Sequence, residues 1–141
     1  MNVSCSPPTR LPACKPSSLS IALRGARAFG GCRYWKYASE HEAFNDALRL
    51  SQGMAFKNAL ADLPFGGGKG VLLHRPDVLD RTELFKAFGR LVQTLDGINL
   101  TAEDVGTTAG DMRAVRSETR YVSGIPRAGN GYGGNPSPRT A

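Results

Sequence analysis

The 141-residue sequence has few of the residues that build disulfide frameworks or metal centres. Its three cysteines, Cys5, Cys14 and Cys32, are odd in number and form no CxxC pair, and neither of its two histidines lies in a metal-ligand spacing with them. This pattern supports neither a disulfide scaffold nor a zinc site. We therefore expect no metal, and a reducing, cytoplasmic location.

Long apolar runs are also missing. No segment approaches the roughly 20 apolar residues that a membrane-spanning helix needs, and residues 1–20 lack the apolar stretch of a secretory signal. The sequence therefore predicts no membrane partner. A content of 40% hydrophobic and 21% charged residues fits one globular domain with a modest core.

Acidic residues are absent from residues 1–38, which hold six Lys/Arg and so carry the whole net charge of +6. The rest of the chain is neutral and has no basic stripe interleaved with aromatics, so no nucleic-acid partner is expected. Residues 1–20 are rich in proline and serine, which predicts disorder. An organelle transit peptide is the alternative, but its amphipathic helix is opposed by the prolines.

Helices and strands are predicted to alternate from Ser39 onward. SEHE pairs Ser39 with Glu42 as a capping box, and small or apolar residues then recur at helical spacing to about Ala61. A buried strand is expected over residues 69–74, a helix from Asp80 or Thr82 to Gly97, a strand in INLTAED, and a helix over 108–118. This alternation predicts an α/β fold. Residues 125–141 are Gly/Pro-rich and are predicted to be a linker.

The stretch LPFGGGKG contains three successive glycines before Lys69. They form either a mobile loop or a place where the backbone approaches another group closely. A phosphate-binding loop is excluded, because Leu63 and Gly70 stand where that motif needs glycine and a hydroxyl residue. Gly129, Gly131 and Gly134 match G-x-G-x-x-G, but no helix can follow in NPSPRTA, so we interpret this match as chance.

Two lysines are candidates for chemistry. Lys57 and Lys69 are separated by the mostly small or apolar NALADLPFGGG, which makes a dry pocket holding both lysines plausible. Two charges about 6 Å apart repel by roughly 3 kcal/mol at an effective dielectric near 20, which lowers a lysine pKa by about two units. Such a lysine could act as a base, with a carboxylate from Asp104 if the second strand ends beside the first. The alternative is two solvated surface lysines.

Three blocks of the sequence resemble the N-terminal domain of the glutamate/leucine/phenylalanine/valine dehydrogenase family, and its leucine and phenylalanine branch in particular. They are GGCRYWKYASEHEAFNDALRLSQGMAFKNALADLPFGGGKGVLL, TAEDVGTTAGDMRAVRSETRYVSG and GGNPSPRTA. The resemblance implies a mixed β-sheet flanked by helices over residues 25–124, used for substrate binding and oligomer contacts. It also implies oxidation of an L-amino acid to a 2-oxo acid and ammonia, with NAD or NADP as hydride acceptor.

The resemblance also implies roles for individual residues. Gly30 and Gly31 would lie against the substrate, Met54 would line its side-chain pocket, and Lys57 would hold its carboxylate. Lys69 would be the catalytic acid/base, and Asp104 would assist proton transfer at the amino group. The glycines before Lys69 would then let the substrate approach the backbone.

Two departures shape the functional prediction. Residues 1–24 do not resemble the family and are expected to be a disordered or aberrant tail, and the chain looks truncated before a dinucleotide domain. We therefore expect no complete Rossmann domain, no cofactor-binding residues and no metal site in this chain. The first hypothesis is the substrate-binding part of an amino-acid dehydrogenase, a homo-oligomer or the partner of a separate chain carrying the dinucleotide domain. The alternative is a non-catalytic remnant or oligomerisation module.

Overall fold

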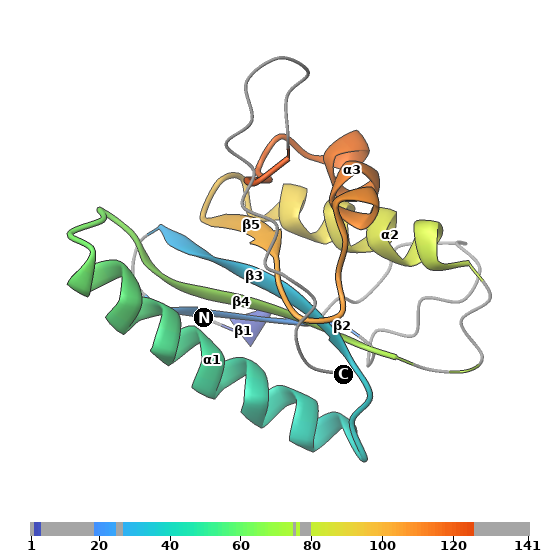
Figure 1. Ribbon diagram of the computed structural model, residues 1–141, viewed down its shortest axis with the longest axis horizontal. Coiled ribbons are helices and arrows are strands. Elements are labelled where there is room, and N and C mark those ends of the chain that lie inside the picture. Colours follow the sequence, from blue (N-terminus) through green and yellow to red (C-terminus); the bar gives the residue numbers. More distant parts are fainter. Residues whose placement is uncertain (1, 4–18, 25–26, 75, 77–79, 126–141) are drawn as a thin grey trace.

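The computed structural model describes residues 2–3, 19–24, 27–74, 76 and 80–125. Within them, a five-stranded sheet is flanked by helices on both faces (Figure 1). The elements in chain order are β1 (Asn2–Val3), β2 (Leu19–Arg24), β3 (Ala28–Trp35), α1 (Glu40–Leu60), β4 (Gly66–Leu73), α2 (Arg81–Thr94), β5 (Asn99–Glu103) and α3 (Ala109–Glu118). The predicted α/β class with a mixed sheet is confirmed. No helix in the described part of the chain is long and apolar enough to cross a bilayer.

The sheet has the strand order β1-β2-β4-β3-β5. Strands β4, β3 and β5 are parallel, and β2 pairs antiparallel with β4. The connection from β3 to β4 leads across the sheet in one direction. The connection from β4 to β5 passes β3 and leads in the opposite direction. Because parallel crossovers are nearly always right-handed, these two connections place their helices on opposite faces. Figure 1 shows this arrangement, with α1 on one side of the sheet and α2 and α3 on the other.

The helices begin where the sequence predicted, at side-chain caps. The hydroxyl of Ser39 accepts from the backbone N–H of Glu42, and Asp80 and Thr108 cap α2 and α3 in the same way. The predicted capping box of α1 is only half formed, because the carboxylate of Glu42 accepts from the N–H of Ala38 instead. The complete capping box belongs to α3, where Thr108 and Asp111 satisfy each other's N–H groups.

Two apolar clusters hold the three layers together. Between α1 and the sheet, Val71 and Leu73 of β4 pack with Ala43 and Ala47. The larger cluster lies between the sheet and the helices α2 and α3, and its largest fully buried side chains include Phe85, Phe88, Leu72 and Met112. The small residues of α1 let this helix lie close to the sheet, whereas the aromatic residues of α2 fill a thicker layer.

Strands β2 and β3 were not predicted from the sequence. AFGGCRYW contains two central glycines and a charge, which weaken a strand pattern, yet β3 pairs with β4 on one side and β5 on the other. Residues 19–24 pair with β4, which differs from the disordered tail expected over residues 1–24. Residues 2–3 of that tail form β1, whereas residues 1 and 4–18 lie outside the described residues, as does the segment beyond residue 125 with its G-x-G-x-x-G match.

The glycine run is part of a strand, not a loop. Strand β4 begins at Gly66, three residues earlier than predicted. A Cβ atom on Gly67 would collide with the backbone of α1 at Ser51 and Ala55, and one on Gly70 would lie 2.6 Å from the ring of Phe88. Gly67 within the run and Gly70 after it therefore make room for helix packing.

Candidate active site

Lys69 is a buried cation in the middle of the sheet, with only 3% of its surface exposed. Lys69 shares one face of β4 with Gly67, Val71 and Leu73, which stand at every second position of the strand. Its side chain therefore leaves the sheet on the face that α1 covers. A charged group at such a place is strongly disfavoured unless it is paired. Its partner is Asp104, whose Oδ2 atom lies 2.7 Å from the Lys69 Nζ atom.

Gly31 makes this ion pair possible. The sequence argument placed Asp104 beside Lys69 if β5 ended next to β4, but β3 lies between these two strands. Gly31 pairs with Ala102 of β5, one residue before the row in which Cys32 pairs with Gly70 and Glu103. A Cβ atom on Gly31 would lie 2.7 Å from the Cβ of Asp104. The missing side chain therefore leaves the space through which Lys69 reaches across β3.

A second cation, Arg33, shares Asp104 with Lys69. Its Nε atom donates to the same Oδ2 atom at 3.0 Å, and one terminal nitrogen donates to Oδ2 of Asp46 on α1, also at 3.0 Å. The hydroxyl of Tyr37 donates to Asp46 at 2.6 Å. Neither Arg33 nor Asp46 was predicted from the sequence as a site residue. The available signal was the strand alternation that puts Arg33 on the same face as Gly31, but β3 itself was not predicted.

The loop that carries Asp104 is fixed by hydrogen bonds. The hydroxyl of Thr107 accepts from the backbone N–H of Asp104 and donates to its carbonyl oxygen, both at 2.8 Å. Arg81 donates to the carbonyl oxygen of Gly106 at 2.8 Å and forms two bonds with Asp111. The N-terminus of α2 and the start of α3 thus hold the loop after β5 in place, so Asp104 stands at a defined position.

Burial and charge shift both partners of the ion pair. Burial lowers the pKa of Lys69 from its ordinary value; Asp104 opposes this shift, and the positive charge of Arg33 adds to it. Burial alone would raise the pKa of the Asp104 carboxyl, but Lys69 and Arg33 outweigh it and hold that pKa below its usual range. The site therefore contains a stable carboxylate and a lysine that releases its proton more easily than a free lysine does, which suits proton transfer.

Burial also raises the pKa of the Cys32 thiol, which lies on β3 beside the ion pair and is a free cysteine. A thiol with a raised pKa is a poor nucleophile, so Cys32 is part of the core.

The predicted substrate-binding residues lie partly together. Met54 of α1 is half-buried, and its Cγ atom lies 3.1 Å from the position of a Cβ on Gly30. Lys57 follows one turn later on α1, but its side chain is exposed and has no ion-pair partner among the described residues. The prediction of a dry pocket that holds both lysines is therefore wrong. The cation next to Lys69 is Arg33, not Lys57.

Neither the connection between β3 and α1 nor the glycine run of β4 has the form of a dinucleotide site. A pyrophosphate is held by a glycine-rich turn between a strand and the N-terminus of a helix. Between β3 and α1 the chain reads KYAS, and the glycine run lies inside β4 rather than after it. These two segments thus offer NAD or NADP no phosphate cradle of that kind.

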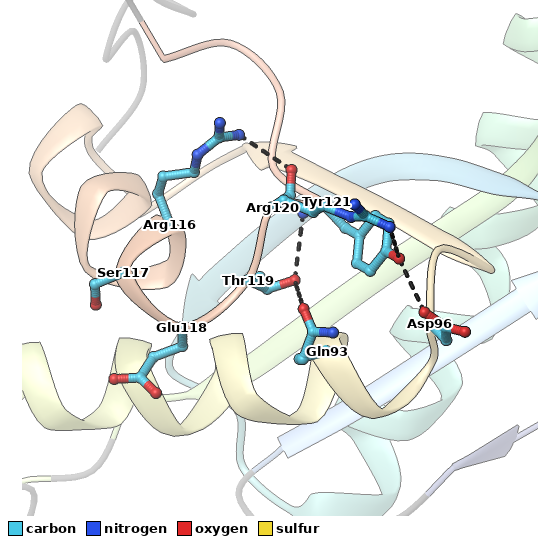
Figure 2. A pocket seen from close by; sticks show the side chains of 8 residues that line it. All are labelled: Gln93, Asp96, Arg116, Ser117, Glu118, Thr119, Arg120 and Tyr121. Atoms are coloured by element: carbon cyan, nitrogen blue, oxygen red, sulfur yellow. Dashed lines mark hydrogen bonds between the residues drawn. The ribbon is translucent and has the colours of Figure 1, made fainter.

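A surface hollow of about 450 Å³ lies elsewhere, between the end of α2 and the segment after α3 (Figure 2). Its polar groups already bind one another: Thr119 donates to Gln93 at 2.9 Å, and Tyr121 donates to Asp96 at 2.9 Å. None of its lining residues belongs to the Lys69 site. We interpret these contacts as structural, because they connect the end of α2 to the segment that follows α3.

Acid should weaken the fold through its paired carboxylates. The pKa values of Asp46, Asp104 and Asp111 are all held below their usual range, in spite of burial, by partners that include Tyr37, Lys69 and Arg81 respectively. Carboxyls with depressed pKa values contribute stability above their unfolded pKa, and this stability is lost as the pH falls through the folded value.

We therefore expect the free energy of unfolding to fall by roughly 2 kcal/mol or more between pH 6 and pH 3, as measured by urea denaturation. Asp111→Asn should lower stability at pH 6 but reduce this dependence on pH. A flat profile in the unmodified chain would contradict the ion-pair assignments.

Solved structures of known proteins identify the structural class of this chain. A solved L-tryptophan dehydrogenase from Nostoc punctiforme superposes with a TM-score of 0.73 and 35% identity, covering 86% of this chain and 36% of that chain. A glutamate dehydrogenase from Thermus thermophilus, at 22% identity and a TM-score of 0.56, shares the fold. The chain therefore has the α/β architecture of an amino-acid dehydrogenase domain.

The sequence comparisons give the family. The profile of the Glu/Leu/Phe/Val dehydrogenase dimerisation domain matches residues 24–121, and the chain belongs to this family. It is 54% identical to the leucine dehydrogenase of Thermoactinomyces intermedius, over 81% of this chain and 31% of that protein. It is 46% identical to the phenylalanine dehydrogenase of Bacillus thermotolerans, over 81% of this chain and 30% of that protein. The predicted resemblance is confirmed, and the chain spans about a third of the length of these relatives.

Proposed function

We propose that this chain is the substrate-binding and proton-transferring part of an NAD(P)-dependent L-amino-acid dehydrogenase. The observation that carries the proposal is the buried Lys69, 2.7 Å from Asp104, in a domain that belongs to the dehydrogenase family. A surface lysine would need neither burial nor a carboxylate reached across a neighbouring strand. A reducing, cytoplasmic setting fits Cys32, a free thiol.

The proposed roles follow from the chemistry of each group. Lys69 takes a proton from the water that attacks the imine carbon, because a lysine with a lowered pKa is a competent base. Asp104 exchanges a proton with the substrate amino group, so that ammonia leaves as a neutral molecule. Lys57 binds the substrate carboxylate, and its exposure in this chain leaves its ammonium free to do so. The hydride goes to NAD or NADP, and no residue described here is assigned to hold that cofactor.

The proposed substrate is an L-amino acid with an apolar side chain. Relatives of this chain include leucine, phenylalanine and valine dehydrogenases. Met54, half-buried beside Gly30, would line the side-chain pocket, and the backbone at Gly30 and Gly31 would lie against the substrate. A thioether adapts to different apolar shapes, which suits this class of substrate.

A chimaera tests the proposal. Residues 24–121 of this chain would replace the matching segment of the Thermoactinomyces leucine dehydrogenase, and NADH formation would be followed with leucine, valine and phenylalanine. Turnover with at least one of them supports the proposal. A folded, oligomeric chimaera without turnover would favour the alternative, a non-catalytic oligomerisation module, which the family's description as a dimerisation domain keeps open. The same description supports a homo-oligomer, or assembly with a separate chain that carries a dinucleotide domain.

Binding of a 2-oxo acid should depend on Lys57. We expect 4-methyl-2-oxopentanoate to bind the unmodified chain weakly, and Lys57→Ala to weaken this binding by about tenfold or more, because a carboxylate loses a charged hydrogen bond worth roughly 1.5–3 kcal/mol. The matched control is Lys86→Ala, which removes a lysine from α2 on the opposite side of the sheet. Ligand-detected NMR would measure both. Equal binding by the two variants would remove Lys57 from the site.

A further inference from the structure

Arg33 is the group that connects the ion pair to α1. Its Nε atom donates to Oδ2 of Asp104 at 3.0 Å, and Lys69 Nζ lies 2.7 Å from the same oxygen. The two nitrogens are therefore less than about 6 Å apart, as two bonds of these lengths to one atom require. Two cations sharing one carboxylate oxygen compete for its charge and repel each other.

Asp46 holds Arg33 in this position from the other side. One terminal nitrogen of Arg33 donates to Oδ2 of Asp46 at 3.0 Å, and the Tyr37 hydroxyl donates to the same oxygen. Arg49, whose side chain is 80% exposed, lies 3.0 Å from the other oxygen of Asp46. Charges thus alternate from Lys69 through Asp104, Arg33 and Asp46 to the surface of α1. A planar guanidinium can bridge two carboxylates in this way, whereas a lysine is a single point charge.

We propose that Arg33 is a positioning residue: by sharing the Oδ2 atom of Asp104 with Lys69, it sets how readily Lys69 gives up its proton, and Asp46 fixes it there. This rests on the proposed function, in which Lys69 transfers protons. Asp104 holds the buried Lys69 in its ammonium form, against the effect of burial. Arg33 stays charged at every relevant pH, so it acts as a fixed charge that weakens this hold.

The groups around the Lys69–Asp104 pair make the titration of Lys69 simple to interpret. Lys69 of β4 faces Asp104 at the end of β5 and Arg33 of β3, and the Cys32 thiol, on the other face of β3, acts on it only electrostatically. Arg33 also faces Asp46 of α1 and the nearby Tyr37. Burial raises the pKa values of both Cys32 and Tyr37, so these two groups stay neutral while Lys69 titrates. Changes in the Lys69 titration therefore report on Arg33 and the two carboxylates.

The test is NMR titration of the lysine Cε and Nζ signals in the full 141-residue chain, with the Lys69 signal assigned by Lys69→Met. We expect Arg33→Gln to move the titration midpoint of Lys69 to higher pH by about one unit, because a nearby positive charge is lost. Arg49→Gln is the matched control: it removes an arginine from the same Asp46 but not from Asp104, and should leave the midpoint unchanged.

Two results would overturn the inference: an unchanged Lys69 midpoint in Arg33→Gln, or an equal change in Arg49→Gln. If Arg33→Gln does not fold, the double variant Arg33→Met with Asp46→Leu removes the pair together and should still raise the midpoint, since apolar replacement of a whole ion pair is tolerated. Titration with 4-methyl-2-oxopentanoate separates the two proposals. Absence of binding by the unmodified chain would count against the proposed function, whereas a shifted midpoint in Arg33→Gln would still support the role of Arg33.

Discussion

Replacing Gly67 by alanine should lower the free energy of unfolding by about 3–5 kcal/mol, a large part of the 5–15 kcal/mol of a typical domain. The added methyl group would collide with the Ser51 carbonyl oxygen and the Ala55 amide nitrogen, both in the backbone of α1. Backbone atoms cannot rotate away as a side chain can, so α1 would have to move off the sheet.

The contacts around Gly67 resist such a movement. The side-chain amide of Asn58, which is 2% exposed, donates to the carbonyl oxygens of Phe29 at 3.3 Å and Gly66 at 2.8 Å. Shifting α1 would leave these buried groups unpaired, which is costly. Besides its apolar contacts, the helix that carries Met54 and Lys57 therefore depends on the missing side chain of Gly67 and on the amide of Asn58 for its close approach to the sheet.

Gly53→Ala is the matched control. Gly53 lies in the interior of α1, and a Cβ atom there would meet nothing within 4 Å. Alanine should therefore stabilise the chain by about 0.5–1 kcal/mol through helix propensity. Urea unfolding followed by circular dichroism measures both variants. A loss below about 1 kcal/mol in Gly67→Ala would show that α1 does not lie against the strand backbone there.

Lys69→Met should reduce turnover of the chimaeric dehydrogenase by about 10²–10⁴-fold, the usual contribution of a general base. Methionine fills a similar volume but cannot accept a proton from water. Binding of 4-methyl-2-oxopentanoate should survive, because the proposed carboxylate ligand is Lys57. This split between turnover and binding distinguishes the base from a binding residue.

The fold should tolerate the same substitution. Asp104 keeps its bond to Arg33 at 3.0 Å when Lys69 is lost, so no buried carboxylate is left unpaired. Lys86→Met serves as control, because Lys86 pairs only with Glu83 on the surface of α2 among the described contacts. Turnover of Lys69→Met close to that of the control would exclude Lys69 as the acid/base.

The sequence by itself predicted the features that depend on neighbouring residues. Ser39 and Thr108 mark the starts of α1 and α3, and the structure selects Asp80 over Thr82 as the cap of α2; such predictions are possible because a capping side chain and the N–H it satisfies are three residues apart in the chain. Strand β5 was predicted from its own local sequence, and long blocks that resemble the family and follow its order led to the correct family.

The sequence could not predict β3, and the errors about the site follow from that. Because no strand was predicted in AFGGCRYW, the strand order β4-β3-β5 could not be predicted. The partner of Lys69 could then be placed only by assuming that β4 and β5 are neighbours. Lys57 and Lys69 were paired because they are close in the chain. The structure instead brings Arg33 to Lys69 from the central strand.

The sequence thus determined the presence of the helices α1, α2 and α3, the α/β class and the identity of Lys69 and Asp104 as candidates, because caps, periodicity and motifs are local. Only the tertiary structure decided which groups act on Lys69. Parallel pairing puts Gly31 between Lys69 and Asp104, and α1 brings Asp46 to Arg33. These distances depend on strand order and on the approach of a helix to a sheet, which are properties of the folded chain and not of any short segment within it.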